Sequence, residues 1–375
     1  MSSWIDSPEV TGGKRRQGQA SYCERAGKRL EKQKQLYLVL DDWSRGFTID
    51  KIDDDDTDAD LTKQPGILRV VAPVTGRSMI FNAMGSHIFI TTNPRCGQTP
   101  SLVYDTETAG LAVGPPLPES LLGEAHRCIA TADKLYAFRR LIRDPHQFLK
   151  VLSWAPTDND DPWVRGPTME WRWQSVDSPW PFTDNEIINS YALHPDGHTI
   201  FFSAVSKYRN IDQKTICTFS FDTKDRRWNS HGQWSLPFED QGYYDSMLDA
   251  WVGLNKDGYL CSCQVASRSS TSQSPPDCKV LQEMMLCKPL NGRRRPAPTA
   301  TLTHTGGNNP KFCLLDCVLR DGDDTRGAAR GFILHITTFG LKYTHKGELQ
   351  TMNRVTNSHT VSKHDALFSP VAFWM

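Results

Sequence analysis

The chain has 375 residues, of which 38% are hydrophobic and 23% are charged. This length and composition exclude a largely unfolded polypeptide and are sufficient for a large core. Lys and Arg together number 43, as do Asp and Glu, so the formal net charge is zero. The chain therefore lacks the broad positive field that binding to nucleic acid or to an anionic membrane surface would require.

The first segment, residues 1–34, is polar and basic and has few apolar side chains to bury. This composition predicts a disordered basic leader. The chain has no apolar run long enough for a transmembrane helix or a secretory signal, which predicts a cytoplasmic or nuclear protein that is not secreted. Two basic clusters in the leader have the spacing of a bipartite nuclear localisation signal. Its candidate residues are Lys14, Arg15, Lys28, Arg29 and Lys32.

From residue 35 onward, short apolar runs alternate with turns rich in Gly, Pro, Asp, Asn and Ser. Helical periodicity is scarce, and its best candidate is one short turn near Glu119–Leu122. This pattern predicts a single all-β domain over residues 35–375.

Within this domain a turn of small or charged residues, followed by a compact β-run, occurs six times. The runs are LYLVL from Leu36, IFITT from Ile88, LYAF from Leu135, TIFFS from Thr199, YLCS from Tyr259 and FILHI from Phe332. Their spacing fits one four-stranded blade per run. The repeats therefore predict a β-propeller of six four-stranded blades, with five or seven blades left open.

A second repeated unit places an Asp-Thr turn between two further β-runs, in residues 102–118 and again in residues 219–237. Asp and Thr side chains cap such turns by bonding to the backbone. The chain begins its fold in LYLVLDDW and ends in ALFSPVAFWM. We expect these two segments to pair and to close the propeller, because an unpaired sheet edge promotes aggregation.

Three segments resemble a large, uncharacterised family of grass proteins that are described as kelch-like or F-box-associated. The segments are LYLVLDDWSRGFTIDKID, GSHIFIT with VYDTETAGLAVGPPLP, and ALFSPVAFWM. The resemblance implies a kelch-like propeller over residues 35–375 and no assigned reaction. The Gly-Gly pair of a typical kelch strand is absent, and the leader contains no Leu-Pro start of an F-box. The adaptor role of F-box proteins is therefore not expected in this chain.

No motif in the chain indicates a catalytic residue, a metal ligand or a cofactor. The cysteines at positions 261, 263, 313 and 317 lie inside apolar β-runs, although structural zinc sites place paired cysteines in loops. This setting predicts free, buried thiols, so the sequence predicts no catalytic residue, no metal and no cofactor.

The loop that joins the second and third strands of each blade projects to one face of a propeller, and these loops are repeatedly basic here. We name the predicted ring of basic residues the basic rim: Arg45, Arg95, Arg139, Arg140, Arg143, Lys207, Arg209 and Arg268. Arginine favours acidic or phosphorylated partners through paired hydrogen bonds. The alternative is that acidic residues of the neighbouring inter-blade loops neutralise the rim: Glu119, Glu124, Asp184, Glu186, Glu239 and Asp240.

Two main classes of function remain, beside a third possibility, a nuclear regulator that uses the basic leader. The preferred hypothesis is a non-enzymatic protein–protein interaction module that binds a protein or peptide, and it predicts an exposed apolar or aromatic patch. The alternative is an enzyme or small-ligand binder that uses the central channel, and it predicts convergent His, Asp or Glu with perturbed pKa values. The identity of the partner and the oligomeric state stay open.

Overall fold

A computed structural model of the chain describes residues 34–41, 46–52, 66–71, 79–123, 126–141, 148–157, 168–183, 186–207, 216–268, 274–283, 285–286, 300–306, 310–319, 331–362 and 368–375. Within these ranges the regular structure is almost entirely β-strand, and the one helical element is the 3-10 turn η2 (Glu119–Leu121). None of the described helices could span a membrane. Lys34–Met375 forms one compact unit. The prediction of an all-β domain is confirmed.

The described strands form six sets of four antiparallel strands, and sets 1, 2, 3 and 6 are separate sheets. Set 1 contains β24 (Val371–Trp374), β1 (Leu36–Asp41), β2 (Phe47–Ile52) and β3 (Leu68–Val70). Set 2 contains β4 (Ile80–Met84), β5 (His87–Thr91), β6 (Ser101–Asp105) and β7 (Gly110–Gly114). Set 3 contains β8 (His126–Ala130), β9 (Lys134–Arg139), β10 (Leu149–Pro156) and β11 (Met169–Ser175).

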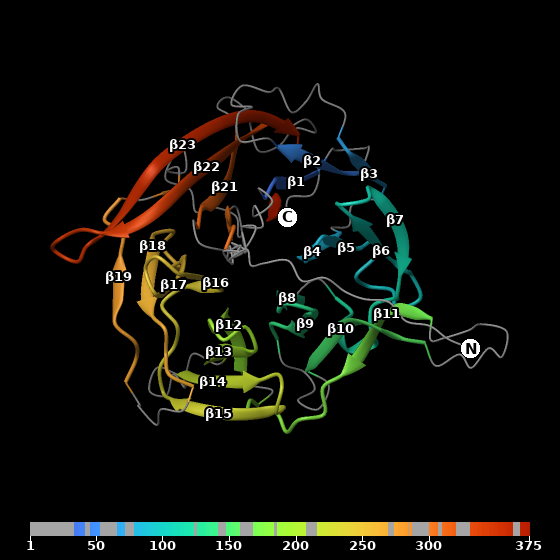
Figure 1. Ribbon diagram of the computed structural model, residues 1–375, viewed down its shortest axis with the longest axis horizontal. Coiled ribbons are helices and arrows are strands. Elements are labelled where there is room, and N and C mark those ends of the chain that lie inside the picture. The colour runs from blue at the N-terminus through green and yellow to red at the C-terminus, as the bar shows by residue number, and fades with distance from the viewer. Residues whose placement is uncertain are drawn as a thin grey trace, which may run out of the picture. The chain divides into compact units, whose positions relative to one another are not determined.

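Sets 4 and 5 share one eight-stranded sheet, because their first strands β12 and β16 pair in parallel. Set 4 contains β12 (Glu186–Leu193), β13 (Thr199–Ser206), β14 (Ile216–Asp222) and β15 (Arg227–Gly232). Set 5 contains β16 (Glu239–Asp245), β17 (Ala250–Leu254), β18 (Leu260–Gln264) and β19 (Cys278–Val280). Set 6 contains β20 (Ala300–His304), β21 (Phe312–Leu319), β22 (Gly331–Tyr343) and β23 (Leu349–Ser362). The sets lie around a common centre, with strands such as β8, β12 and β16 innermost (Figure 1).

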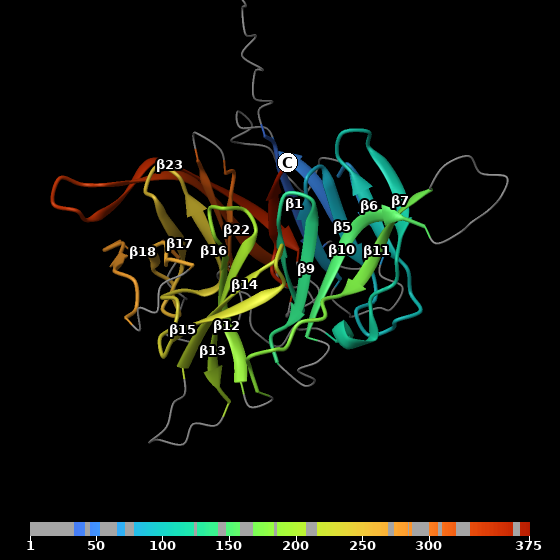
Figure 2. The ribbon, with the colours of Figure 1, turned by 60° about the horizontal axis from the view of Figure 1, so that its bottom comes forward.

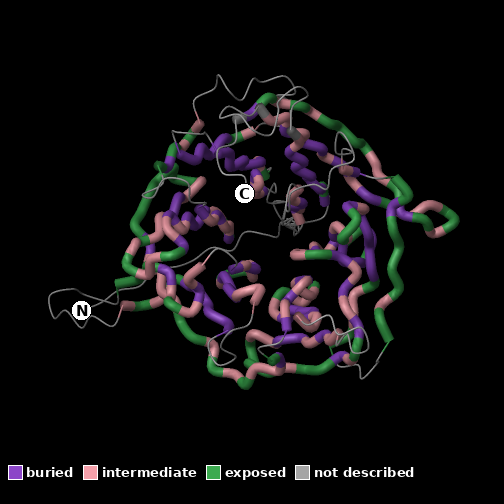
Figure 3. The backbone as a smooth tube through the Cα atoms, turned by 180° about the vertical axis from the view of Figure 1, so that it is seen from behind, coloured by how far each residue is buried: buried purple, intermediate pink, exposed green. Residues whose placement is uncertain are grey.

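The second strand of a set is buried on both faces, which explains the repeated apolar runs. In β1, Leu36 and Leu38 pack toward set 6, whereas Tyr37 and Val39 pack toward set 2. Successive side chains of such a strand point alternately into two cores, so its sequence is a continuous apolar run. The outermost strands are mainly exposed (Figure 3).

The six predicted runs do not all occupy the same place in their sets. The first four form β1, β5, β9 and β13, which are second strands. The last two, YLCS and FILHI, form the third strands β18 and β22. Third strands are also buried, for example β18, so a compact apolar run does not by itself identify the second strand of a set.

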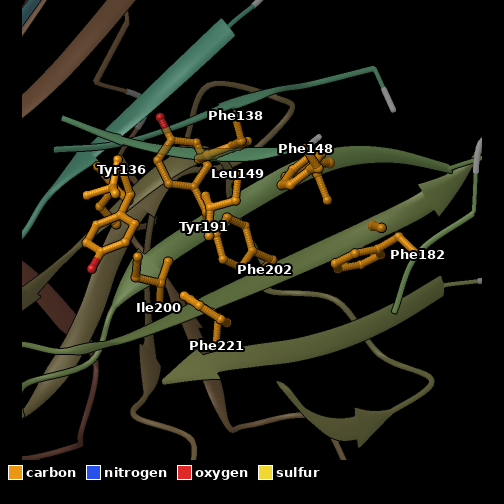
Figure 4. Packing of buried hydrophobic residues seen from close by; sticks show 13 residues of the cluster. Tyr136, Phe138, Phe148, Leu149, Phe182, Tyr191, Ile200, Phe202 and Phe221 are labelled. Carbon is orange, nitrogen blue, oxygen red and sulfur yellow. The ribbon is translucent and has the colours of Figure 1, made fainter. Parts of the chain in front are cut away.

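Six apolar clusters fill the spaces between the sets, and each cluster joins two neighbouring sets. In the cluster between sets 3 and 4, Phe138 packs edge-on against Tyr191 and Phe202, with ring centroids 5.0 Å apart in both cases (Figure 4). The same arrangement joins the last set to the first, since Leu315 and Leu36 belong to one cluster.

The first and last strands pair as predicted. Leu36 lies opposite Trp374 and Leu38 opposite Ala372 in the antiparallel β1–β24 register. The backbones of Gln35 and Met375 exchange two hydrogen bonds of 2.9 and 3.0 Å beyond the end of this pairing. Set 1 is therefore completed by both ends of the described unit.

Both copies of the Asp-Thr turn are also confirmed. Asp105 accepts hydrogen bonds from the Glu107 backbone N–H at 3.0 Å and from Thr108 Oγ1 at 2.7 Å. Asp222 accepts one from the Lys224 N–H at 2.9 Å. Each turn joins the third and fourth strands of its set.

We expect Ala372→Asp to unfold the unit, because Ala372 is buried between sets 6 and 1 and a carboxylate there has no partner. The expected loss of unfolding free energy is about 3–5 kcal/mol. Chemical denaturation followed by circular dichroism measures it. Thr360→Asp on exposed β23 is the matched control and should change stability by less than about 0.5 kcal/mol.

Removal of residues 366–375 should abolish solubility, because β1 would lose its partner β24. A soluble truncated chain with cooperative unfolding would contradict the role given to β24.

Candidate functional site

Most of the described basic-rim residues lie at the predicted loops. Arg95 is exposed in the β5–β6 loop, Arg139 ends β9 and Arg140 follows it, and Lys207 follows β13. Each of these loops joins the second strand of its set to the third. Arg45, Arg143 and Arg209 lie outside the described residues.

Arg268 does not belong to the basic rim, and this prediction is wrong. It lies between β18 and β19, the third and fourth strands of set 5, and so at the opposite ends of the strands. There its guanidinium pairs with Asp196 Oδ2 at 3.1 Å, in the β12–β13 turn. The misplacement follows from the YLCS run, which is the third strand of its set. The second-to-third loop of set 5 carries Lys256 and Asp257 instead.

The structure brings the Arg95 loop close to Arg139. Gly123 N–H donates a 2.7 Å hydrogen bond to the Pro94 carbonyl, and a Cβ on Gly123 would lie 3.1 Å from an Nη atom of Arg139. These contacts link sets 2 and 3 at one face.

The acidic residues that could neutralise the rim are partly engaged elsewhere. Asp240 pairs with Arg127 on β8, and Glu186 accepts a 2.8 Å hydrogen bond from the Thr183 N–H. Glu124 and Asp184 lie outside the described residues, as do the leader residues Lys14, Arg15, Lys28, Arg29 and Lys32. Neutralisation of the rim as a whole therefore stays a hypothesis.

An aromatic surface on the outer strands of set 3 was not identified from the sequence. We define it as Trp154, Met169 and Trp171, on the face of β10 and β11 that points toward set 2. Trp154 is 50% exposed and Met169 is 41% exposed. The Trp171 ring contacts Trp154 at 5.2 Å and Phe89 of set 2 at 4.9 Å, measured between ring centroids. β10 and β11 lie side by side in both ribbon views (Figures 1 and 2).

The sequence indicates this surface, because Met169, Trp171 and Trp173 alternate with the charged residues Glu170 and Arg172 along one strand. Trp171 packs between sets 2 and 3, whereas Trp154 and Met169 are only half covered.

A polar cluster lies on the three neighbouring first strands β8, β12 and β16. Arg127 Nε donates a 3.0 Å hydrogen bond to Asp240 Oδ1, joining β8 to β16 past the intervening β12. Burial, followed by the Asp240 charge, raises the pKa of Tyr191 on β12 well above its usual value. Burial likewise raises the pKa of Tyr243. These groups converge from strands far apart in the sequence, so no local motif could have revealed them.

The backbone around this cluster is irregular. Asp240 has a φ of 56°, in the left-handed region that non-glycine residues rarely adopt. The β12–β13 register shifts between Ile188 and Ser190, and the β16–β17 register shifts between Glu239 and Tyr243. Bulges and left-handed residues are concentrated at functional sites in proteins. The cluster contains one ion pair and no carboxylate pair that could act as acid and base.

The four cysteines predicted to be buried thiols, at positions 261, 263, 313 and 317, are all buried and are not part of a disulfide. The sequence prediction for their setting is confirmed. No group of His, Cys, Asp or Glu within the described ranges has the arrangement of a metal site.

These strands define an all-β protein of four-stranded antiparallel sheets. The family model described as a protein of unknown function (DUF1668) matches residues 33–359. The chain belongs to the DUF1668 family. A comparison with curated protein sequences finds no match.

Solved structures with some similarity include the nidogen/laminin complex, with a TM-score of 0.41, 8% identity, and coverage of 90% of this chain and 98% of that chain. The complex of KlAtg21 with the coiled coil of AgAtg16 has a TM-score of 0.36 and 9% identity, and the match covers 86% of this chain and 96% of that chain. Apo AztD from Citrobacter koseri has a TM-score of 0.37 and 11% identity, and the match covers 91% of this chain and 98% of that chain. Scores this low support no inference about function, so the assignments rest on strand pairing and packing.

We expect acid sensitivity from His126, a buried histidine at the start of β8. Burial, together with Arg127 and Arg139, lowers the pKa of its imidazole to about 4. The unfolded chain binds this proton near pH 6.5, so His126 contributes stability above that pH which is lost as the pH falls from 6.5 toward 4. The loss amounts to about 3 kcal/mol. His126→Gln should flatten the pH dependence of the unfolding free energy in this window, measured by denaturation between pH 7 and 4.

His345, exposed between β22 and β23, provides the matched control. His345→Gln should leave the pH dependence of unfolding unchanged. An equal pH dependence in the wild-type and His126→Gln proteins would contradict the assignment to His126.

Proposed function

We propose that residues 35–375 form a closed, six-bladed, kelch-like β-propeller that acts as a non-enzymatic protein–protein interaction module. Each of the six four-stranded sets would be one blade. Closure is supported by the apolar cluster that joins set 6 to set 1 and by the pairing of β1 with β24.

The observation that carries this proposal is the aromatic surface. Trp154 and Met169 expose large apolar side chains on the same face of the β10–β11 pair, although a solvated strand would normally carry polar residues there. Tryptophan and methionine are enriched at the centres of protein interfaces. A partner that covered them would remove this apolar area from water.

The expected occupant is an extended peptide segment of a partner protein with an aliphatic or aromatic anchor. β11 ends its sheet, so its outer edge has no strand partner among the described residues. An added strand would satisfy the backbone groups of this edge and place alternate side chains beside Trp171. The exposed ion pair of Arg172 with Glu170 lies on the face of β11 opposite Met169 and Trp171.

The basic rim is proposed as a separate contact for acidic or phosphorylated segments. Exposed Arg95 and the neighbouring Arg139 favour it, because both lie at one face of sets 2 and 3. Paired hydrogen bonds from guanidinium groups to carboxylate or phosphate would carry the recognition.

An enzyme or small-ligand binder remains the second candidate. The cluster of Arg127, Asp240 and Tyr191 favours it, since these groups converge on the innermost strands and the backbone there is irregular. A ligand of this cluster should raise the melting temperature of the wild-type protein and not that of Asp240→Asn.

Affinity capture from cell extract, followed by mass spectrometry, tests the main proposal. We expect the double variant Trp154→Ala, Met169→Ala to capture at least tenfold less of a specific partner than the wild-type protein does. This is the effect of losing a hot spot worth about 1.4 kcal/mol or more of binding free energy. Met247→Ala, which removes a methionine that is 68% exposed elsewhere, is the matched control and should retain the partner. A synthetic peptide from the captured partner should then bind the wild-type protein and Met247→Ala more tightly than the Trp154→Ala, Met169→Ala variant.

Further arms separate the other proposals. If the triple variant Arg95→Ala, Arg139→Ala, Arg140→Ala loses the partner and the aromatic-surface variant retains it, binding would be assigned to the basic rim. Equal capture by the wild type and by both surface variants would contradict the interaction-module proposal at these surfaces. A chain without residues 1–34 tests the leader: its exclusion from nuclei, with the partner retained, would support the localisation signal at Lys14, Arg15, Lys28, Arg29 and Lys32.

A further inference from the structure

Three cysteines meet on the last two strands of set 5. Cys261 and Cys263 are two residues apart on β18, so they lie on the same face, which packs toward set 4. Cys278 is the first residue of β19 and lies directly opposite Cys263 in the antiparallel register. The three thiols are therefore neighbours, although Cys278 is distant from the other two in the sequence.

The hydrogen-bond pattern brings these side chains close. The backbone bonds from Gln264 N to Asp277 O and from Leu281 N to Leu260 O mark the hydrogen-bonded pairs of this ladder. Cys263 and Cys278 consequently form a non-hydrogen-bonded pair, in which Cα atoms are about 4.5 Å apart and side chains are closest. Cys261 lies diagonally across from Cys278; its thiol donates to the Gly253 and Pro237 carbonyls and also interacts with the Cys278 thiol. The spacing of the directly opposed Cys263–Cys278 pair lies in the range that disulfides bridge.

The surroundings of the thiols differ sharply. Cys261 and Cys263 are fully buried, whereas Cys278 is exposed on the outermost strand. The hydrogen bond from Cys261 lowers the pKa of Cys278, because it stabilises the thiolate. The hydrogen bond to Cys278 and burial raise the pKa of Cys261. One accessible thiol that ionises readily therefore lies beside two protected thiols, which is the arrangement of a reactive cysteine with a resolving cysteine.

We propose that Cys278 is a reversible oxidation site that reacts with hydroperoxides and then forms a disulfide with Cys261. This inference does not depend on the proposed interaction function. In the first step the Cys278 thiolate attacks the terminal oxygen of the hydroperoxide. An S–O bond forms, the O–O bond breaks, and the alkoxide takes a proton to leave as the alcohol. The sulfur is oxidised to sulfenic acid and the peroxide is reduced.

In the second step the Cys261 sulfur attacks the sulfenic sulfur. The S–S bond forms, the S–O bond breaks, and the leaving hydroxide takes the Cys261 proton to give water. Two thiols and one hydroperoxide thus yield one disulfide, one alcohol and one water. A dithiol reductant reverses the change by thiol–disulfide exchange.

The test uses the full chain with Cys23→Ser and Cys287→Ser, since these two residues lie outside the described ranges. The reduced protein is treated with equimolar hydrogen peroxide, alkylated, digested with trypsin and analysed by mass spectrometry. We expect a peptide containing Cys278 to be linked to the peptide that contains both Cys261 and Cys263, and dithiothreitol to release it. Cys96 has a lowered pKa, through hydrogen bonds from Thr99 and the Gln98 backbone, and is the matched single thiol that should not enter this link.

Serine variants assign the partner. Cys261→Ser should reduce the linked product by about tenfold or more and leave Cys278 as a sulfenic acid that dimedone traps. Cys263→Ser, which changes an equally buried thiol and therefore controls for folding, should retain the link. Loss of the link in Cys263→Ser with retention in Cys261→Ser would overturn the choice of Cys261. Persistence of the Cys278 thiol while Cys96 is oxidised would overturn the proposal as a whole.

Discussion

Apolar packing between neighbouring four-stranded sets is the constraint on which the other features depend. Each set has two faces, and each face is covered by the next set rather than by helices. Strands such as β1 and β9 must therefore be apolar on both sides. Leu135 and Ala137 of β9 pack toward set 2, whereas Tyr136 and Phe138 pack toward set 4. The inner strands are held by this packing, and the outer strands and loops are free to vary.

Close packing also limits which residues can stand between sets 4 and 5. The Phe238 ring lies against Gly253 of β17, where an added Cβ would come within 2.6 Å of the ring. A side chain at position 253 would have to displace this ring, because interiors tolerate little added volume. The segment that joins the two sets is thereby held against both of them.

The all-β class and the pairing of β1 with β24 could be predicted from the sequence, because both follow from local apolar runs. The strand position of the YLCS run could not, because second and third strands are both buried and give similar apolar runs. Arg268 therefore lies on the face opposite the predicted rim. The pairing of Arg127 with Asp240 depends on strands 113 residues apart, and no single segment encodes it. The half exposure of Trp154 likewise depends on tertiary packing, which the sequence of β10 alone does not encode.

The pairing of β1 with β24 has a consequence for how the chain folds during synthesis. Leu36 and Leu38 are synthesised long before their neighbours Ala372 and Trp374. The first apolar strand therefore lacks this partner until β24 has been synthesised, and closing so long a loop carries an entropic cost. Until then the nascent chain exposes an unpaired apolar strand edge, for which molecular chaperones are the natural protection.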